Sequence, residues 1–143
     1  MAKVELKPVG VIKARLGIEP NGRVQRKFQS LCGRYMASYV PGGEGGEIEK
    51  YKDMSNPTQI VYYHPGAHYQ YTGILYVMDN GKGAYYSPSY GFWSKPGATK
   101  NATNTPLNYH IPGTGDHWDE RMKSAEMDNL VEDLQKFVDR GGK

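Results

Sequence analysis

Apolar residues recur three and four positions apart in two stretches of the chain, one near each end. The first set runs through Val24, Phe28, Leu31, Cys32, Tyr35, Met36 and Tyr39. This spacing keeps apolar side chains on one face of a helix. Asn21 and Gly22 precede the pattern, and Pro41 with Gly42 follows it. We therefore predict a helix that buries an aromatic and aliphatic face.

A second helix is predicted over residues 116–140, with Thr114 or Asp116 as its cap and Gly141 beyond its end. Its apolar residues fall on two stripes that are rotated against each other: Trp118, Met122 and Ala125, then Met127, Leu130, Val131, Leu134 and Val138. The helix therefore either bends or turns one stripe to the core and the other to a neighbouring subunit. We expect Trp118 to be buried, with Tyr69 near it or at a subunit contact.

The segments between the helices are short and rich in β-formers. Strands are predicted over residues 47–54, 58–63, 74–78 and 84–87, and extended pieces over 3–6 and 105–111. A helical turn is predicted over 67–72, and Gly73 ends it. Asn80-Gly81 predicts a hairpin between 74–78 and 84–87. Residues 9–16 read as a short helix, residues 88–105 as a long loop, and Gly42–Gly46 as a loop that is ordered only in an assembly.

These elements indicate the fold class. Two helices around short, locally connected strands predict an α+β fold with an antiparallel sheet of short strands flanked by the two main helices. A length of 143 residues predicts a single domain over residues 1–143.

Charge is unevenly distributed along the chain. The net charge of +3 divides into +6 for residues 1–40, zero for 41–110 and −3 for 111–143. A basic and an acidic end favour head-to-tail contacts between copies, or a basic face toward nucleic acid. No apolar run is long enough to span a membrane, and Met1–Leu6 lacks the apolar core of a signal peptide. The single Cys32 excludes an internal disulfide and reads as a small buried apolar residue.

Aromatic residues concentrate in the middle of the sequence. Nine of the twelve tyrosines lie between Tyr51 and Tyr90. A tyrosine combines a large apolar ring with a polar tip, which suits surfaces that bind a partner. The candidate contact surface consists of Tyr62, Tyr63, Tyr69, Tyr71 and Trp93.

Basic residues follow helical spacing on the polar side of the first helix. Arg23, Arg26, Lys27 and Arg34 share one stripe there. Three interpretations stay open: a solvated face, contact with DNA phosphates, or contact with the acidic last helix of a neighbouring subunit.

The sequence offers little for catalysis or for a metal. His64 and His68 are four residues apart, but Pro65-Gly66 between them disfavours a helix, and no acidic or cysteine cluster adjoins them. Asp116, Asp119 and Glu120 are explained by the start of the last helix. We expect no catalytic residues, no metal and no cofactor. A metal-dependent hydrolase at His64 and His68 is the lesser alternative.

Three segments, in this order, carry a resemblance to a known family. They are Leu16–Ile18 with Asn21–Arg26 continuing to Tyr39-Val40-Pro41, then Ile60–Tyr63 with Ala67–Tyr71, and then His117–Met122. The chain resembles the minor capsid proteins of long-tailed phages of Gram-positive bacteria, which belong with the tail-completion and head–tail connector proteins. It departs from them at Gly42–Ile48, where the family carries a Thr-Gly-Thr-Leu-like element.

The resemblance implies a structural virion protein, made in the bacterial cytoplasm, at the head–tail junction of the phage. It implies a homo-oligomeric ring, more often of six subunits than of twelve, that joins other neck and tail proteins and leaves room for non-specific contact with packaged DNA. It implies no catalysis and no membrane. The alternative is a small nucleic-acid-binding protein that uses the basic helix over residues 23–34.

Overall fold

The computed structural model describes residues 3–4, 11, 15–42, 47–83, 85–89, 91–93 and 97–142. Its helices include α2 (Arg23–Met36), α3 (Glu47–Lys50), α4 (Ala67–Thr72) and α5 (Trp118–Asp139). Its strands are β1 (Lys52–Asp53), β2 (Val61–Tyr62), β3 (Ile74–Val77), β4 (Tyr85–Ser87), β5 (Gly91–Trp93) and β6 (Asn101–Pro106). In this part of the chain the strands form three two-stranded antiparallel sheets, β1–β2, β3–β6 and β4–β5. The predicted α+β class is confirmed, with the strands in separate ribbons.

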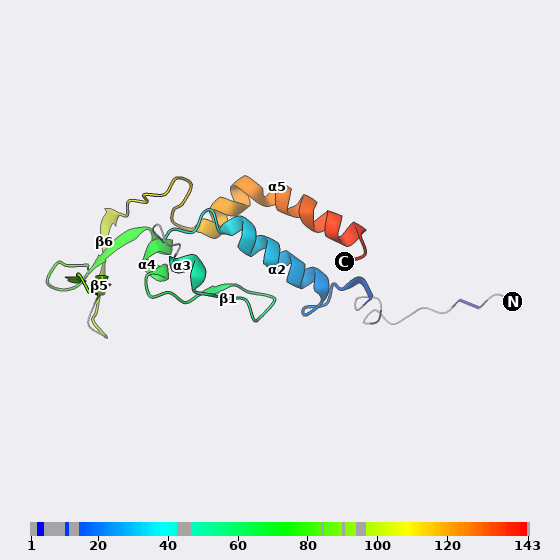
Figure 1. Ribbon diagram of the computed structural model, residues 1–143, viewed down its shortest axis with the longest axis horizontal. Helices are drawn as coiled ribbons and strands as arrows, with labels where there is room; N and C mark the ends of the chain where they lie inside the picture. Colours follow the sequence, from blue (N-terminus) through cyan, green and yellow to red (C-terminus); the bar gives the residue numbers. More distant parts are fainter. Residues whose placement is uncertain are drawn as a thin grey trace.

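Helices α2 and α5 lie side by side and antiparallel (Figure 1). Three contacts mark the pairing from one end to the other. The Lys27 ammonium sits over the Phe137 ring at 5.4 Å, Arg34 forms a 3.0 Å ion pair with Asp133, and the Tyr39 hydroxyl donates to Glu126 at 3.2 Å. The start of each helix therefore lies beside the end of the other.

The core sits where α2, α3, α4 and α5 meet. It consists of Leu31, Met36 and Val40 from and after α2, Ile48 from α3, Ala67 from α4, and Trp118, Met122 and Leu130 from α5. The burial of Trp118, with 3% of its surface exposed, confirms its predicted place. On α5 both stripes reach the core through Met122 and Leu130, while Val131 and Val138 remain 53% and 41% exposed.

A buried glutamine fixes α2 to the segment over residues 54–59. The Gln29 side chain is 8% exposed, and its amide donates to the carbonyls of Met54, Asn56 and Gln59 at 3.0, 2.7 and 2.8 Å. One turn earlier, Gln25 donates to Pro57 O at 2.9 Å. Buried carbonyls need such partners, since an unsatisfied one costs free energy. The segment is thereby held against α2.

The prediction of a strand over residues 47–54 is wrong for its first half. Residues 47–50 form α3, which buries Ile48 and carries a 3.7 Å ion pair between Lys50 and Glu47 three residues apart. A single apolar residue among charges is compatible with a strand or a helical turn, and contact with the core selects the turn. Only Lys52 and Asp53 pair as a strand, with Tyr62 and Val61.

The predicted hairpin between residues 74–78 and 84–87 is also wrong. The turn itself forms, with Gly81 N donating to Met78 O at 2.9 Å and Gly81 at φ +80°. Its two arms then pair with other strands: β3 pairs with β6, and β4 pairs with β5. Both β5 and most of β6 lie in the region predicted as a long loop.

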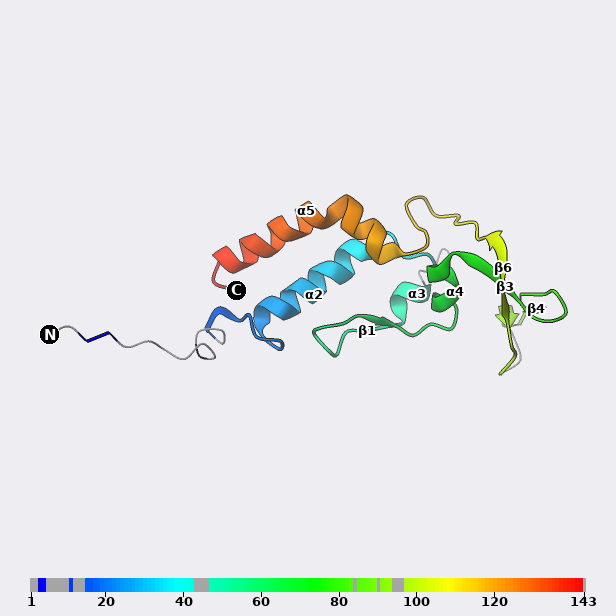
Figure 2. The ribbon, with the colours of Figure 1, turned by 180° about the vertical axis from the view of Figure 1, so that it is seen from behind.

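The β3–β6 ribbon stands at the far end of the molecule from the paired helices (Figure 2). No residue of β3 or β6 is buried. The ribbon is reached through Gly73, which ends α4 with φ +76° as the Gly after residues 67–72 predicts.

Some predictions fall outside the described residues. These are residues 5–6 of the extended piece over 3–6, most of the helix over 9–16, and Gly43–Gly46 of the glycine loop. After β6, residues 107–111 adopt no regular strand.

Candidate protein-interaction site

An open groove of about 680 Å³ runs between α2, the segment over residues 57–62 and the start of α5. Its walls are mostly apolar and include Phe28, Cys32, Met36, Ile60, Trp118 and Met122. Gln25, Gln59, Asp119 and Lys123 add polar groups. The volume lies within the range of sites that bind ligands the size of a drug or a short peptide. We refer to this feature as the α2–α5 groove.

Two tyrosines and a tryptophan build one end of the α2–α5 groove. The indole of Trp118 meets the rings of Tyr62 and Tyr71 edge to face, with centroids 5.4 and 5.0 Å apart. Such pairs add stabilisation beyond the apolar area that they bury. The Tyr71 hydroxyl also donates to Asp119 at 2.9 Å, so α4 and α5 hold each other here.

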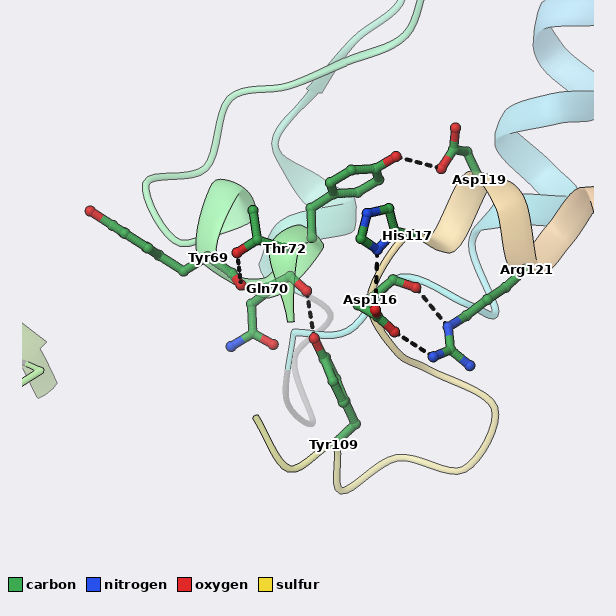
Figure 3. A network of polar contacts seen from close by, with 9 residues as sticks. Tyr69, Gln70, Thr72, Tyr109, Asp116, His117, Asp119 and Arg121 are labelled. Atoms are coloured by element: carbon green, nitrogen blue, oxygen red, sulfur yellow. Dashed lines mark hydrogen bonds and ion pairs between the residues drawn. The ribbon is translucent and has the colours of Figure 1, made fainter. Parts of the chain in front are cut away.

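Polar contacts connect α4 with the segment before α5 (Figure 3). The Arg121 guanidinium donates hydrogen bonds to the Asp116 carbonyl, at 2.6 Å, and to one oxygen of the Asp116 carboxylate. The other carboxylate oxygen lies 3.1 Å from His117 Nδ1. The guanidinium and the imidazole lower the pKa of Asp116, against a smaller effect of burial. Tyr109 donates to the carbonyl of Gln70 at 2.6 Å. Tyr109 therefore connects the segment before α5 to α4, and Arg121 connects Asp116 to the first turn of α5.

Backbone conformation tightens the same junction. A Cβ on Gly73 would stand 2.7 Å from the Asp116 Cβ, so only glycine fits there at this φ. His117 replaces the predicted caps Thr114 and Asp116 as the N-cap of α5, at φ 44° and without a side-chain cap bond. A non-glycine residue with positive φ is strained unless its neighbours hold it. Here the 3.0 Å bond from His117 N to Tyr71 O does so.

The groove contains polar groups whose chemistry burial changes. Among the described residues, the Tyr62 hydroxyl is buried without a hydrogen-bond partner. Burial, reinforced by Glu49 and Asp119, raises the pKa of Tyr62. Burial also raises the pKa of the Cys32 thiol, with Lys123 opposing it. Cys32 is thus a half-buried, neutral thiol on the groove wall, less enclosed than its predicted place in the core.

The predicted aromatic contact surface divides into separate places. Tyr62 and Tyr71 lie on the groove, as described above. Tyr63, 58% exposed, packs on Tyr51 with centroids 5.6 Å apart. Tyr69 packs on Tyr76 at 5.0 Å and lies under the Lys100 ammonium at 5.2 Å, so its contacts are with the ribbon and not with Trp118. The side chain of Trp93 lies outside what the structure describes.

The four residues of the predicted basic stripe differ in their contacts. Lys27 and Arg34 contact α5 of the same chain through Phe137 and Asp133. Arg23 and Arg26 are exposed, and their guanidinium groups donate to the carbonyls of Arg15 and Asn21. Intramolecular contact with the acidic helix therefore engages half of the stripe.

The two histidines proposed as metal ligands lie in different surroundings. His64 Nδ1 accepts the Gly66 amide at 3.0 Å, and His68 packs on Tyr69 and Tyr76. The part of the chain that the structure describes contains no group of three or more potential metal ligands. In the same part of the chain, no helix is both long and apolar enough to cross a membrane.

Sequence reasoning missed the groove and the residues that hold its walls. Gln25 and Gln29, four apart on α2, were a signal, because two amides at helical spacing can hold one segment. Asp116 and Arg121, five apart, gave none. No family model, curated protein or solved structure matches the chain.

Proposed function

We propose that this chain is a structural virion protein of a phage neck, which joins head and tail as one subunit of an oligomeric ring. The proposal rests on the resemblance of the three ordered segments to the minor capsid proteins. It assigns the chain no reaction and takes its partners to be copies of itself and other neck and tail proteins.

The observation that supports an assembly role best is the β3–β6 ribbon. Ile74, Leu75, Tyr76 and Val77 are four consecutive apolar residues of β3, each only half-buried. A two-stranded sheet is marginally stable in water unless something packs on it. Within the described residues its outer edges pair with no further strand, and such edges accept strands of other chains. A neighbouring subunit would cover both the apolar residues and the edges.

The second part of the proposal is that the basic stripe contacts the packaged DNA. A neck ring surrounds the path of the genome. Arg23, Arg26 and Arg34 are all exposed, and because Arg34 is ion-paired with Asp133, Arg23 and Arg26 are the candidates for contact with DNA. Their contact with DNA would be through phosphates and independent of sequence, since the DNA must slide. Reversing both charges should then leave tails joined but impair DNA retention or ejection. Failure of tails to join would make the stripe a protein contact instead.

Imaging of purified phage particles by cryo-electron microscopy tests the main proposal. We expect several copies of the chain in one ring at the neck. The resemblance to the minor capsid proteins favours a ring with six-fold symmetry over one with twelve-fold symmetry. Particles that contain a single copy or none would overturn it. A salt-dependent shift of DNA by the isolated chain, without a place in particles, would favour the nucleic-acid-binding alternative.

A pair of variants connects the ring to the ribbon. Val77→Asp places a charge on the half-buried strand, and Thr105→Asp places the same charge on the exposed strand of the same ribbon. In complementation of a phage that lacks the gene, we expect Val77→Asp to yield unjoined heads and tails. Thr105→Asp should join them, because residue 105 is already exposed.

A further inference from the structure

The α2–α5 groove has no occupant within the described part of the chain. Its apolar walls are unfavourable to leave exposed to water. Its outer wall includes Val61, which is 41% exposed, and Ile60, which is half-buried. Phe28, Met122 and Trp118 extend the apolar surface inward. An apolar groove rimmed by polar groups is typical of a site that binds a peptide segment.

The first fifteen residues include a stretch in which apolar and charged residues alternate, as a segment that binds an apolar groove requires. Val4 and Leu6 alternate with Lys3, Glu5 and Lys7. In an extended segment this alternation places both apolar side chains on one side and the charges on the other. Val4 is 82% exposed, and the next described apolar residues, Val11 and Leu16, are 46% and 54% exposed. Among the described residues, the buried core begins at Leu31 and includes none of residues 3–4, 11 and 15.

Charge favours the same pairing. Residues 1–15 carry four basic side chains and one glutamate. The start of α5 carries Asp119 on the groove and Glu120 beside it, with Lys123 one turn further. The N-terminal half of a helix favours acidic side chains, which in turn attract a basic segment. A basic, alternating segment therefore matches the apolar wall and the acidic side chains of Asp119 and Glu120, while Lys123 opposes it.

Length permits the segment to reach another subunit. From residue 15 back to Val4 the chain spans up to about 36–40 Å when extended. That distance is comparable with the diameter of a small domain, so the segment can leave its own helix α2 and cross to a neighbour. Exchange of identical segments between copies is a low-cost route to association, and a head-to-tail contact of this kind closes into a ring when its rotation permits.

We propose that the α2–α5 groove binds the N-terminal segment of a neighbouring copy, with Val4 and Leu6 on the apolar wall. This inference rests on the proposed ring and names one of its contacts. It commits to a second copy as the occupant, and occupation by the chain's own segment or by a small apolar molecule are outcomes that would overturn it.

Cys32 provides a built-in reporter, because it is the single cysteine of the chain and lies on the groove wall. Its alkylation by iodoacetamide measures access to the groove. The first experiment uses the isolated full chain at low concentration and adds a synthetic peptide of residues 1–15. The peptide is added at concentrations up to about 1 mM, which is the effective concentration that a neighbouring subunit in a ring would supply. We expect it to slow the alkylation of Cys32 about tenfold.

Two controls make that result specific. A peptide with Val4→Ser and Leu6→Ser keeps every charge and should not protect Cys32. The second control is the full chain with Val138→Ser, which loses exposed apolar surface on α5 away from the groove. The parent peptide should protect Cys32 in this variant as well as it does in the parent chain. A parent peptide that fails to protect Cys32 overturns the inference. So does a thiol already protected in the isolated monomer, which would mean that the chain's own segment or another molecule fills the groove.

The second experiment measures Cys32 in purified phage particles. Protection there, lost in particles assembled with Val4→Ser and Leu6→Ser, supports exchange between copies. A ring seen at the neck with Cys32 as reactive as in the monomer overturns this inference and leaves the proposed function standing. If no ring exists at the neck, the proposed function fails, and the peptide experiment separately reports whether the groove binds the segment.

Discussion

The ring of Tyr71 meets the indole of Trp118 edge to face, with centroids 5.0 Å apart and planes at 88°. Tyr71 comes from α4 and Trp118 opens α5, so two segments 47 positions apart meet at the end of the α2–α5 groove. Because the Tyr71 hydroxyl also binds Asp119, the contact combines apolar and polar stabilisation. The stability of the groove should therefore depend on this pair.

Replacement of Trp118 should be strongly destabilising. The side chain is 3% exposed, and Trp118→Ala removes its contacts with Tyr62 and Tyr71 and leaves a cavity. We expect a loss of about 3–5 kcal/mol in the free energy of unfolding, measured by urea denaturation. Val138→Ala, on the exposed side of the same helix, should change it by less than about 0.5 kcal/mol. Equal effects of the two variants would refute the burial of the indole.

The alkaline limit of stability should move when Tyr71 is replaced. Burial, aided by the hydrogen bond to Asp119, raises the pKa of Tyr71 from 10.0 to about 12. Above pH 10 the unfolded chain loses this proton while the folded chain keeps it, so stability falls as the pH rises from about 10 to about 12. Tyr71→Phe should make the urea midpoint fall less steeply over that range.

A second variant separates the Tyr71 contribution from those of other tyrosines. Burial also raises the pKa of Tyr109, which therefore contributes a slope of the same sign. Tyr63→Phe, at an exposed ring outside the groove, serves as the matched control and should keep the parent slope. A parent-like slope in Tyr71→Phe would show that its hydroxyl titrates as in the unfolded chain.

The acid limit should depend on the contact between α2 and α5. A hydrogen bond from Tyr35 and the charge of Arg34 lower the pKa of Asp133 below its usual 3.8, against a smaller effect of burial. This contribution is present above pH 3.8 and is lost as the pH falls through the folded-state pKa. We expect Asp133→Asn to lower the urea midpoint at neutral pH and to reduce its further fall in acid.

The matched control for that variant is Asp128→Asn, an exposed position on α5 with the same change of charge. Its midpoint should follow the parent chain at neutral and at acid pH. If Asp133→Asn behaves in the same way, the α2–α5 ion pair contributes nothing measurable, as is common for exposed pairs.

The segment over residues 54–59 should loosen when Gln29 is replaced. Gln29→Leu retains the bulk of the side chain but leaves three carbonyls without their donor, and we expect a cost of about 1–3 kcal/mol. Gln25→Leu removes one bond and should cost less. Hydrogen exchange at residues 56–60 should accelerate in Gln29→Leu, and unchanged exchange there would contradict the proposed anchoring.

The sequence by itself determined the elements whose signals are local. The spacing from Val24 to Tyr39 defined the buried face of α2, because a helix repeats its surface every 3.6 residues. Trp118 was correctly placed in the core, and Gly73 correctly ended α4, because a left-handed cap favours glycine. The α+β class followed from the succession of these elements.

Only the tertiary structure decided the relationships between distant segments. The turn at Gly81 formed as its residues indicate, yet β3 paired with β6, since strand pairing depends on which edges meet after the whole chain has folded. Residues 47–50 became helical because Ile48 reached the core. Gln29 was buried because three carbonyls of a segment at least 25 positions away met its amide. The α2–α5 groove arises from the same cause: its walls come from segments that no local pattern connects.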